Sequence, residues 1–235
     1  SQRTCPLSGV RDFLLLQIND ALFPIGGYSH SYGLETYIQK GIVRDADTAE
    51  KYIRQNMRTN LLYNELLLIR LAWEYASEDN LEAILELEEI AEASRSQKEI
   101  REASRKLGSR FLKTTTGLDI GYASGIFLRY AEAAGERVCH PCAYGVFCFA
   151  AGIEKEPALY HFLYSQISAM VTNCVKTIPL SQSIGQKLLN RMTGIFDETL
   201  GRLEDLTESE LCISAPGFAV RSMQHECLYS RIYMS

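Results

Sequence analysis

The four residues Cys139-His140-Pro141-Cys142 form the most prominent candidate for a chemical site in this chain. Two thiols and an imidazole at this spacing are typical ligands of zinc or nickel, and a Cys-x-x-Cys pair at the start of a helix can also be redox-active. No second Cys or His pair lies nearby in the sequence, and a thioredoxin-like site needs a βαβ setting that the sequence does not predict. Metal binding by Cys139, His140 and Cys142 therefore stands as an alternative function, and it predicts stoichiometric metal on the isolated protein.

Other candidates for catalysis are weaker. His30 lies between two serines, where a histidine more often closes local hydrogen bonds than acts as a base or a ligand. No nucleophile has a recognisable local setting, no paired carboxylates stand out, and His161 is expected to face a neighbouring helix. Gly26 and Gly27 lack the lysine and the preceding strand of a phosphate-binding loop. We therefore expect a protein that is not an enzyme and needs no cofactor.

The composition sets broad limits on fold and location. With 46% hydrophobic residues in 235, the chain can bury a sizeable core, and because no linker divides it we expect one domain. A formal charge of −5 argues against nucleic-acid binding, and no stretch approaches the roughly 20 apolar residues of a membrane span. Residues 1–12 lack the features of a secretory signal, and seven scattered cysteines fit reduced thiols. These observations predict a cytoplasmic protein that binds neither nucleic acid nor membranes.

The chain is organised around a corner between two helices, residues 22–35. An apolar helical pattern breaks there at a proline, turns through two glycines that permit positive φ, and restarts after a serine that can cap the next helix. Loops of this kind on a rigid scaffold often carry recognition. The residues that make the turn are Phe23, Pro24, Gly26, Gly27, Ser29 and Ser31.

The spacing of apolar residues predicts an all-α helical bundle. The helix over 12–22 is expected to be buried on most sides, and the helix after the corner to end before Gly41. A long helix capped by Asp45 or Asp47 is expected to enter the core beyond Leu61. Further helices are predicted over 81–93, from about 97 to 113, and over 118–134, 141–153, 160–175 and 181–200.

Two neighbouring helices carry opposite charge. Residues 78–93 hold seven acids and no bases, whereas residues 94–113 hold seven bases and two acids. Antiparallel packing of the two is the simplest interpretation. The alternative is a nucleic-acid helix from Arg95 to Lys113, which needs an unopposed basic face and stacking aromatics, of which only Phe111 is present.

Glycines and uncharged helices suggest close contacts. Gly117, Gly121 and Gly125 recur every fourth residue, which predicts close approach of another helix. The helix 160–175 has an apolar stripe and a second face that is small or polar but also uncharged. Such a face is usually covered, either within the bundle or by another subunit.

Three segments resemble one known family. They are Phe23-Pro24-Ile25-Gly26-Gly27-Tyr28-Ser29-His30-Ser31-Tyr32-Gly33-Leu34-Glu35, then residues 179–189 beginning Pro-Leu-Ser-Gln-Ser, and the tail 223–235. Together they resemble the urease accessory protein F family (UreF), and the tail looks like that of its Helicobacter branch. The resemblance runs from about Arg11 to Ser235 and is loose between Arg44 and Leu118.

The resemblance implies a helical homodimer that assembles with UreD (UreH in Helicobacter), recruits the nickel-carrying GTPase UreG, regulates it, and supports nickel insertion into apo-urease. It implies a flexible N-terminus over 1–10, an all-helical domain over 11–215 and a C-terminal helix or tail over 216–235 for partner docking. Arg231 is expected to brace the Tyr28 loop by charge-assisted hydrogen bonds. The residues expected to bind partners are Pro24, Gly26, Gly27, Tyr28, Ser29, His30, Ser31, Glu35, His225, Tyr229, Arg231 and Tyr233.

Overall fold

The computed structural model describes residues 8–25, 31–95 and 98–211, and it confirms the all-α prediction, because every regular element in these ranges is helical. None of the described helices combines the length and the hydropathy that crossing a membrane requires. The helices are α1 (Ser8–Asn19), α2 (Ser31–Gln39), α3 (Ala46–Asn56), the π-helix η2 (Met57–Leu66), α4 (Leu67–Ser77), α5 (Leu81–Ser94), α6 (Lys98–Thr116), α7 (Ile126–Ala134), α8 (His140–Ala150), α9 (Lys155–Thr177), α10 (Gln182–Glu204) and the 3-10 turn η3 (Glu208–Glu210).

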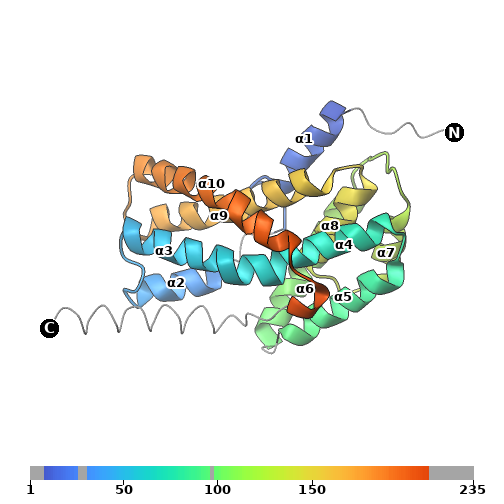
Figure 1. Cartoon of the computed structure of the whole chain (residues 1–235), viewed down its shortest axis with the longest axis horizontal. Helices are drawn as coiled ribbons and strands as arrows, with labels where there is room; N and C mark the ends of the chain where they lie inside the picture. The colour runs from blue at the N-terminus through green and yellow to red at the C-terminus, as the bar shows by residue number, and fades with distance from the viewer. Residues whose placement is uncertain (1–7, 26–30, 96–97, 212–235) are drawn as a thin grey trace.

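The helices α3, η2 and α4 follow one another as a rod across the molecule (Figure 1). Asp45 begins the rod as predicted, since its carboxylate accepts the Thr48 backbone N–H at 2.9 Å and the Thr48 hydroxyl accepts the Asp45 N–H at 3.1 Å. The predicted apolar face is buried, and beyond Leu61 the rod enters the core as expected. The helices α9 and α10 lie along the first half of this rod.

The uncharged helix α8 lies in the centre of the second half of the molecule, in contact with α4, α6, α7 and α9. Its closest contact is with α4, and Gly145 makes that contact possible. A Cβ atom at position 145 would lie 2.5 Å from the backbone oxygen of Ile69, so only glycine fits there without movement of the backbone.

The expectation that the first helix is buried on most sides was wrong. Leu14, Leu15 and Ile18 are buried, but the side chains of Phe13 and Leu16 are 71% and 58% exposed. The helix α1 packs against α9 with its buried face, and it projects from the body of the protein in Figure 1. It also begins at Ser8, inside the stretch 1–10, whereas residues 1–7 lie outside the described residues.

The predicted helix over 118–134 was also wrong in its first half. Helix α7 begins only at Ile126, and residues 117–125 form turns and loop. A Cβ at Gly117 would meet only the carbonyl oxygens of its own preceding turn, and one at Gly125 would meet nothing within 4 Å. The glycines therefore belong to a connection and do not serve the approach of another helix.

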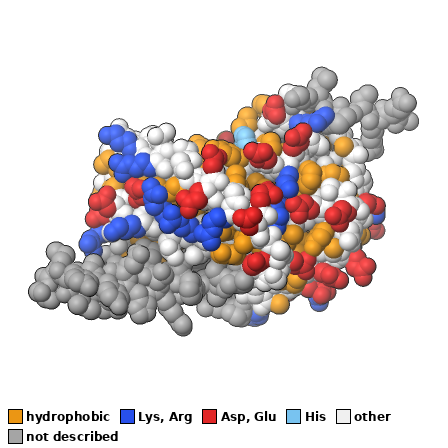
Figure 2. Space-filling view, in the orientation of Figure 1, with side chains coloured by type: hydrophobic (Ala, Val, Ile, Leu, Met, Phe, Trp, Pro, Cys, Tyr) orange, Lys and Arg blue, Asp and Glu red, His pale blue; other side chains and the backbone are white. Residues whose placement is uncertain are grey.

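The oppositely charged helices α5 and α6 are linked by an ion pair between Glu92 and Arg105, but each packs mainly on other helices, α5 on α4 and α7, and α6 on α8. Basic side chains also gather over the half of the surface formed by α3 and α10 (Figure 2). Several are paired with acids, as Arg191 is with Glu50 at 3.0 Å. On the described residues, this basic surface is therefore interrupted by carboxylates.

Candidate functional site

The corner that the sequence singled out is described only at its two ends. Phe23 is buried against Phe111, with ring centroids 5.8 Å apart, while Pro24 is exposed. Residues 26–30, which include Gly26, Gly27, Tyr28, Ser29 and His30, lie outside the described residues. Ser31 opens α2, and Glu35 is exposed on that helix. The structure therefore shows a corner anchored by a buried aromatic ring, with the predicted contact residues left as predictions.

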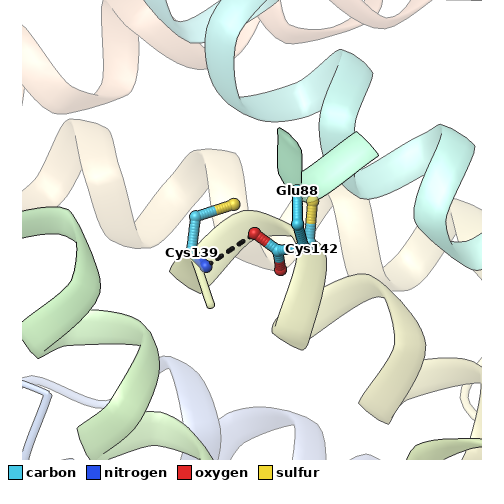
Figure 3. A group of neighbouring side chains, drawn as sticks. All are labelled: Glu88, Cys139 and Cys142. Atoms are coloured by element: carbon cyan, nitrogen blue, oxygen red, sulfur yellow. Dashed lines mark hydrogen bonds between the residues drawn. The ribbon is translucent and has the colours of Figure 1, made fainter. Parts of the chain in front are cut away.

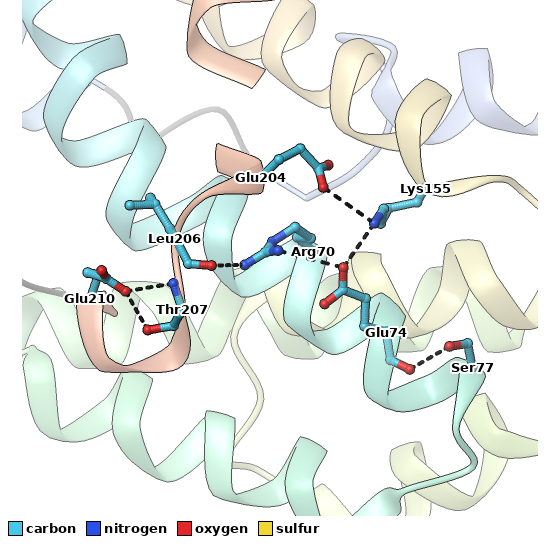
Figure 4. A network of polar contacts seen from close by, with 8 residues as sticks. All are labelled: Arg70, Glu74, Ser77, Lys155, Glu204, Leu206, Thr207 and Glu210. Atoms are coloured by element: carbon cyan, nitrogen blue, oxygen red, sulfur yellow. Dashed lines mark hydrogen bonds and ion pairs between the residues drawn. The ribbon is translucent and has the colours of Figure 1, made fainter. Parts of the chain in front are cut away.

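The predicted tail residues His225, Tyr229, Arg231 and Tyr233 also lie outside the described residues, but the segment that leads to them is held firmly. The buried Arg70 of α4 donates a hydrogen bond to the backbone oxygen of Leu206 (Figure 4). Its neighbour Glu74 accepts from Lys155 at 2.9 Å. The chain after α10 is therefore attached to the rod up to the end of the described range.

A second hydrogen bond attaches the segment after α10 to α4. The Tyr75 hydroxyl donates to the Glu208 carboxylate, which together with burial raises the pKa of Tyr75 to about 12. Thr207 and Glu210 form a capping box around η3. The sequence analysis did not single out Arg70, although an arginine inside the apolar run 66–73 was the available signal, because a buried cation needs a partner.

The Cys-His-Pro-Cys motif begins α8. Cys139 is the residue preceding the first turn and Cys142 lies within it, and both are buried. His140 points elsewhere, since its ring packs among aromatic rings of the core, 5.1 Å from Phe111 and 5.7 Å from Phe162 between centroids. The predicted ligand set Cys139, His140 and Cys142 is therefore wrong in its histidine.

A carboxylate takes the place of the histidine beside the two thiols. Glu88 of α5 accepts the backbone N–H of Cys139 at 2.9 Å (Figure 3). It also accepts a hydrogen bond from the Tyr130 hydroxyl. A carboxylate oxygen of Glu88 and the sulfurs of Cys139 and Cys142 all lie within 4.8 Å of one another. We call these three residues the Glu88–Cys139–Cys142 cluster.

The electrostatics of this cluster follow from burial and from hydrogen bonds. Burial raises the pKa of Glu88 well above its ordinary value, and the neighbouring Cys139 sulfur adds to this. Hydrogen bonding from Cys142 lowers the pKa of the Cys139 thiol, with a further contribution from Arg95, whereas the pKa of Cys142 is raised by the same hydrogen bond and by burial. Burial raises the pKa of Glu65 on the π-helix η2 to about 7, against the opposing charge of Arg95 and with a smaller contribution from Cys139.

A shallow pocket reaches two members of this cluster, Glu88 and Cys139. Its lining combines these buried residues and Val138 with the less buried Arg95, Arg101 and Arg105. The loop that carries Cys139 is pressed against α6, because a Cβ at Gly108 would overlap the backbone oxygen of Val138. Helices α5, α6 and α8 thus fix the cluster jointly.

Sequence reasoning missed Glu88. It lies among seven acids in an acidic helix, where an exposed position is the ordinary expectation. The signal was periodicity, since Ile84, Leu87, Glu88 and Ala91 form the buried stripe of α5. A carboxylate in an apolar stripe needs a partner, and no sequence pattern could name Cys139 as that partner.

The described residues define an all-helical protein whose projecting helix α1 carries exposed apolar side chains. The UreF family model matches residues 43–193. Curated relatives named urease accessory protein UreF include that of Lachnoclostridium phytofermentans, 35% identical over 94% of this chain and 97% of its own length. Those of Haemophilus influenzae strain PittGG and Bacillus sp. strain TB-90 are 35% and 32% identical over 94% of this chain, and over 94% and 97% of their own lengths.

The chain belongs to the UreF family of non-catalytic urease accessory proteins, which act in urease maturation. The resemblance to the UreF family that the sequence indicated is thereby confirmed.

Proposed function

We propose that this chain is a scaffold that forms a homodimer, assembles with UreD/UreH, recruits and regulates the nickel-carrying GTPase UreG, and so supports nickel insertion into apo-urease. Family membership supports a role in urease maturation, and the tail 223–235 motivates the closer likeness to the Helicobacter branch. Four described cysteines, Cys139, Cys142, Cys148 and Cys174, are free thiols, which agrees with the cytoplasmic location that we propose.

The observation that carries the scaffold proposal is uncovered apolar surface on α1 and α9. Phe13 and Leu16 of α1 are 71% and 58% exposed, and Tyr164 of α9 is 46% exposed. The two helices contact one another, and the Ser165 hydroxyl lies 3.5 Å from the Asn19 side-chain oxygen. Large apolar side chains exposed on adjoining helices are typical of surfaces that another chain covers.

Charge is also scarce on this part of α9. Its exposed and half-buried positions between Tyr160 and Val175 include Ser168, Ala169 and Thr172 and no charged side chain. The described residues leave this face exposed, and the sequence pattern already suggested another subunit as one of its two possible covers. We propose that this face forms the homodimer interface, while the corner and the tail serve the GTPase.

Size-exclusion chromatography with light scattering tests the proposal, with the chain alone and mixed with UreD/UreH and UreG. We expect a dimer and a larger complex. Phe13→Asp combined with Leu16→Asp should disrupt assembly, whereas Leu128→Asp, on an exposed apolar side chain of α7, is the matched control and should not. A wild-type protein that is monomeric and forms no complex with UreD/UreH or UreG would refute the scaffold role.

Arg231 tests the GTPase surface separately. Arg231→Ala should abolish recruitment of UreG and leave the dimer intact, because the proposed role of this guanidinium is to brace the Tyr28 loop by charge-assisted hydrogen bonds. Recruitment at the wild-type level would show that the loop does not depend on this residue.

A further inference from the structure

The Glu88–Cys139–Cys142 cluster has a geometry that the scaffold role does not use. Its three donor groups come from two helices and from positions 51 residues apart in the chain, yet they lie within 4.8 Å of one another (Figure 3). In a tetrahedral site with metal–ligand distances of about 2.0–2.3 Å, neighbouring ligand atoms lie roughly 3.3–3.8 Å apart. The cluster therefore needs to contract by at most about 1 to 1.5 Å to enclose an ion.

The donor types define the class of ion. Two thiolates and one carboxylate suit zinc and other borderline divalent ions such as nickel, whereas calcium and magnesium prefer oxygen ligands throughout. Cys139 and Cys142 also have the Cys-x-x-Cys spacing that recurs in zinc sites, and the start of α8 sets their relative positions.

Hydrogen bonds around Glu88 resemble those that orient a metal-binding carboxylate. Its two oxygens accept from the Cys139 backbone N–H and from the Tyr130 hydroxyl, and both donors are buried. Capping of α8 explains the first of these bonds. It does not explain two thiols within reach of the same carboxylate, whereas a metal site with outer hydrogen bonds to its ligands explains both.

Charge balance at the cluster also fits a divalent cation. Two thiolates and a carboxylate carry three negative charges; a divalent cation balances two of them, and the nearby guanidinium of Arg95 supplies further positive charge. Arg95 shares the pocket lining with Glu88 and Cys139, and its guanidinium is held by a 2.9 Å hydrogen bond to the Ala91 backbone oxygen.

We propose that Glu88, Cys139 and Cys142 bind one divalent cation of the zinc and nickel class, which enters through the pocket beside Val138. The pocket side supplies access for an exchangeable fourth ligand such as water, as in zinc sites that have three protein ligands. This site goes beyond the scaffold role, and it does not require that any partner be bound.

Metal binding to the full, reduced chain tests the proposal, with Zn²⁺ and Ni²⁺ titrated separately by calorimetry and bound metal measured after desalting. We expect the wild type to bind one equivalent that is lost in Cys139→Ala, Cys142→Ala and Glu88→Gln. Cys148→Ala, another buried thiol on α8, is the matched control and should bind like the wild type. Nickel should give a sulfur-to-metal absorption band that disappears in the same variants.

Tyr130→Phe provides a finer test that leaves all three ligands in place. Loss of the hydroxyl that orients Glu88 should weaken binding by about 10- to 100-fold, and circular dichroism establishes that each variant is folded. The proposal is overturned if the reduced wild type binds neither ion, or if the ligand variants retain the wild-type stoichiometry, which would place the metal elsewhere. Assembly with UreD/UreH and UreG is measured without metal, so failure here and failure of the scaffold role remain distinguishable.

Discussion

Replacement of Gly145 by alanine tests the contact on which the centre of the fold depends. A new Cβ would lie 2.5 Å from the Ile69 backbone oxygen, 3.1 Å from the Ala72 Cβ and 3.2 Å from the Trp73 backbone nitrogen. Two of these atoms belong to the backbone of α4, so the clash cannot be relieved by rotation of a side chain. Overpacking of this kind costs about 1 to 3 kcal/mol.

The matched control is Gly194→Ala in the interior of α10, where a Cβ would meet nothing within 4 Å. Both substitutions gain about 1 kcal/mol of helix propensity, so the difference between the two variants isolates the packing cost. We expect Gly194→Ala to raise the free energy of unfolding by about 1 kcal/mol, and Gly145→Ala to fall about 1 to 3 kcal/mol below it. Urea unfolding followed by circular dichroism measures both, and equal stabilisation by the two alanines would refute the close α4–α8 contact.

Two further predictions concern the polar contacts at the start of α3 and after the end of α10. Asp45→Ala should lower stability at pH 7 by about 0.5 to 2 kcal/mol. Hydrogen bonds from Thr48 hold the pKa of Asp45 below its ordinary value. This contribution is therefore present above the unfolded pKa of about 3.9 and is lost as the pH falls through the lower folded pKa, so urea midpoints of wild type and variant should converge in acid. Arg70→Met leaves the Leu206 carbonyl without its buried donor and should speed hydrogen exchange over 206–211, with unchanged exchange arguing against the anchor.

Much of the fold could be predicted because apolar periodicity and capping residues identify helices in a sequence. Asp45 and Ser181 begin their helices as expected, and Gly41 adopts φ of 69° just after α2. The failures have one physical origin. Periodicity reports which residues are apolar, but it does not report what covers them, and so Phe13 and Leu16 were predicted to be buried. Glycines similarly permit both close packing and loops, which is why the repeat at Gly117 was misinterpreted.

Only two of the three residues of the candidate site could be predicted from the sequence, for a related reason. Local spacing identified Cys139 and Cys142, since ligands three residues apart on a helix start are close in any fold. The third ligand depends on how α5 packs against α7 and α8, which is a long-range property. His140 was the nearer choice in sequence, but its position turns it into the aromatic core around Phe111 and Phe162.

Arg70 and Glu88 show which sequence signal deserves more weight in chains of this kind. Each is a charged residue at a buried position of an apolar stripe, and each finds a backbone group far away in the chain, Leu206 at a separation of 136 residues and Cys139 at a separation of 51. A buried charge without such a partner would be costly, so its presence in a stripe predicts a long-range polar contact. In this protein the two contacts fix the segment that leads to the tail and the cluster that we propose binds metal. A charge inside an apolar stripe therefore marks Arg70 and Glu88 as residues with a long-range polar partner, although it does not identify Leu206 or Cys139 as that partner.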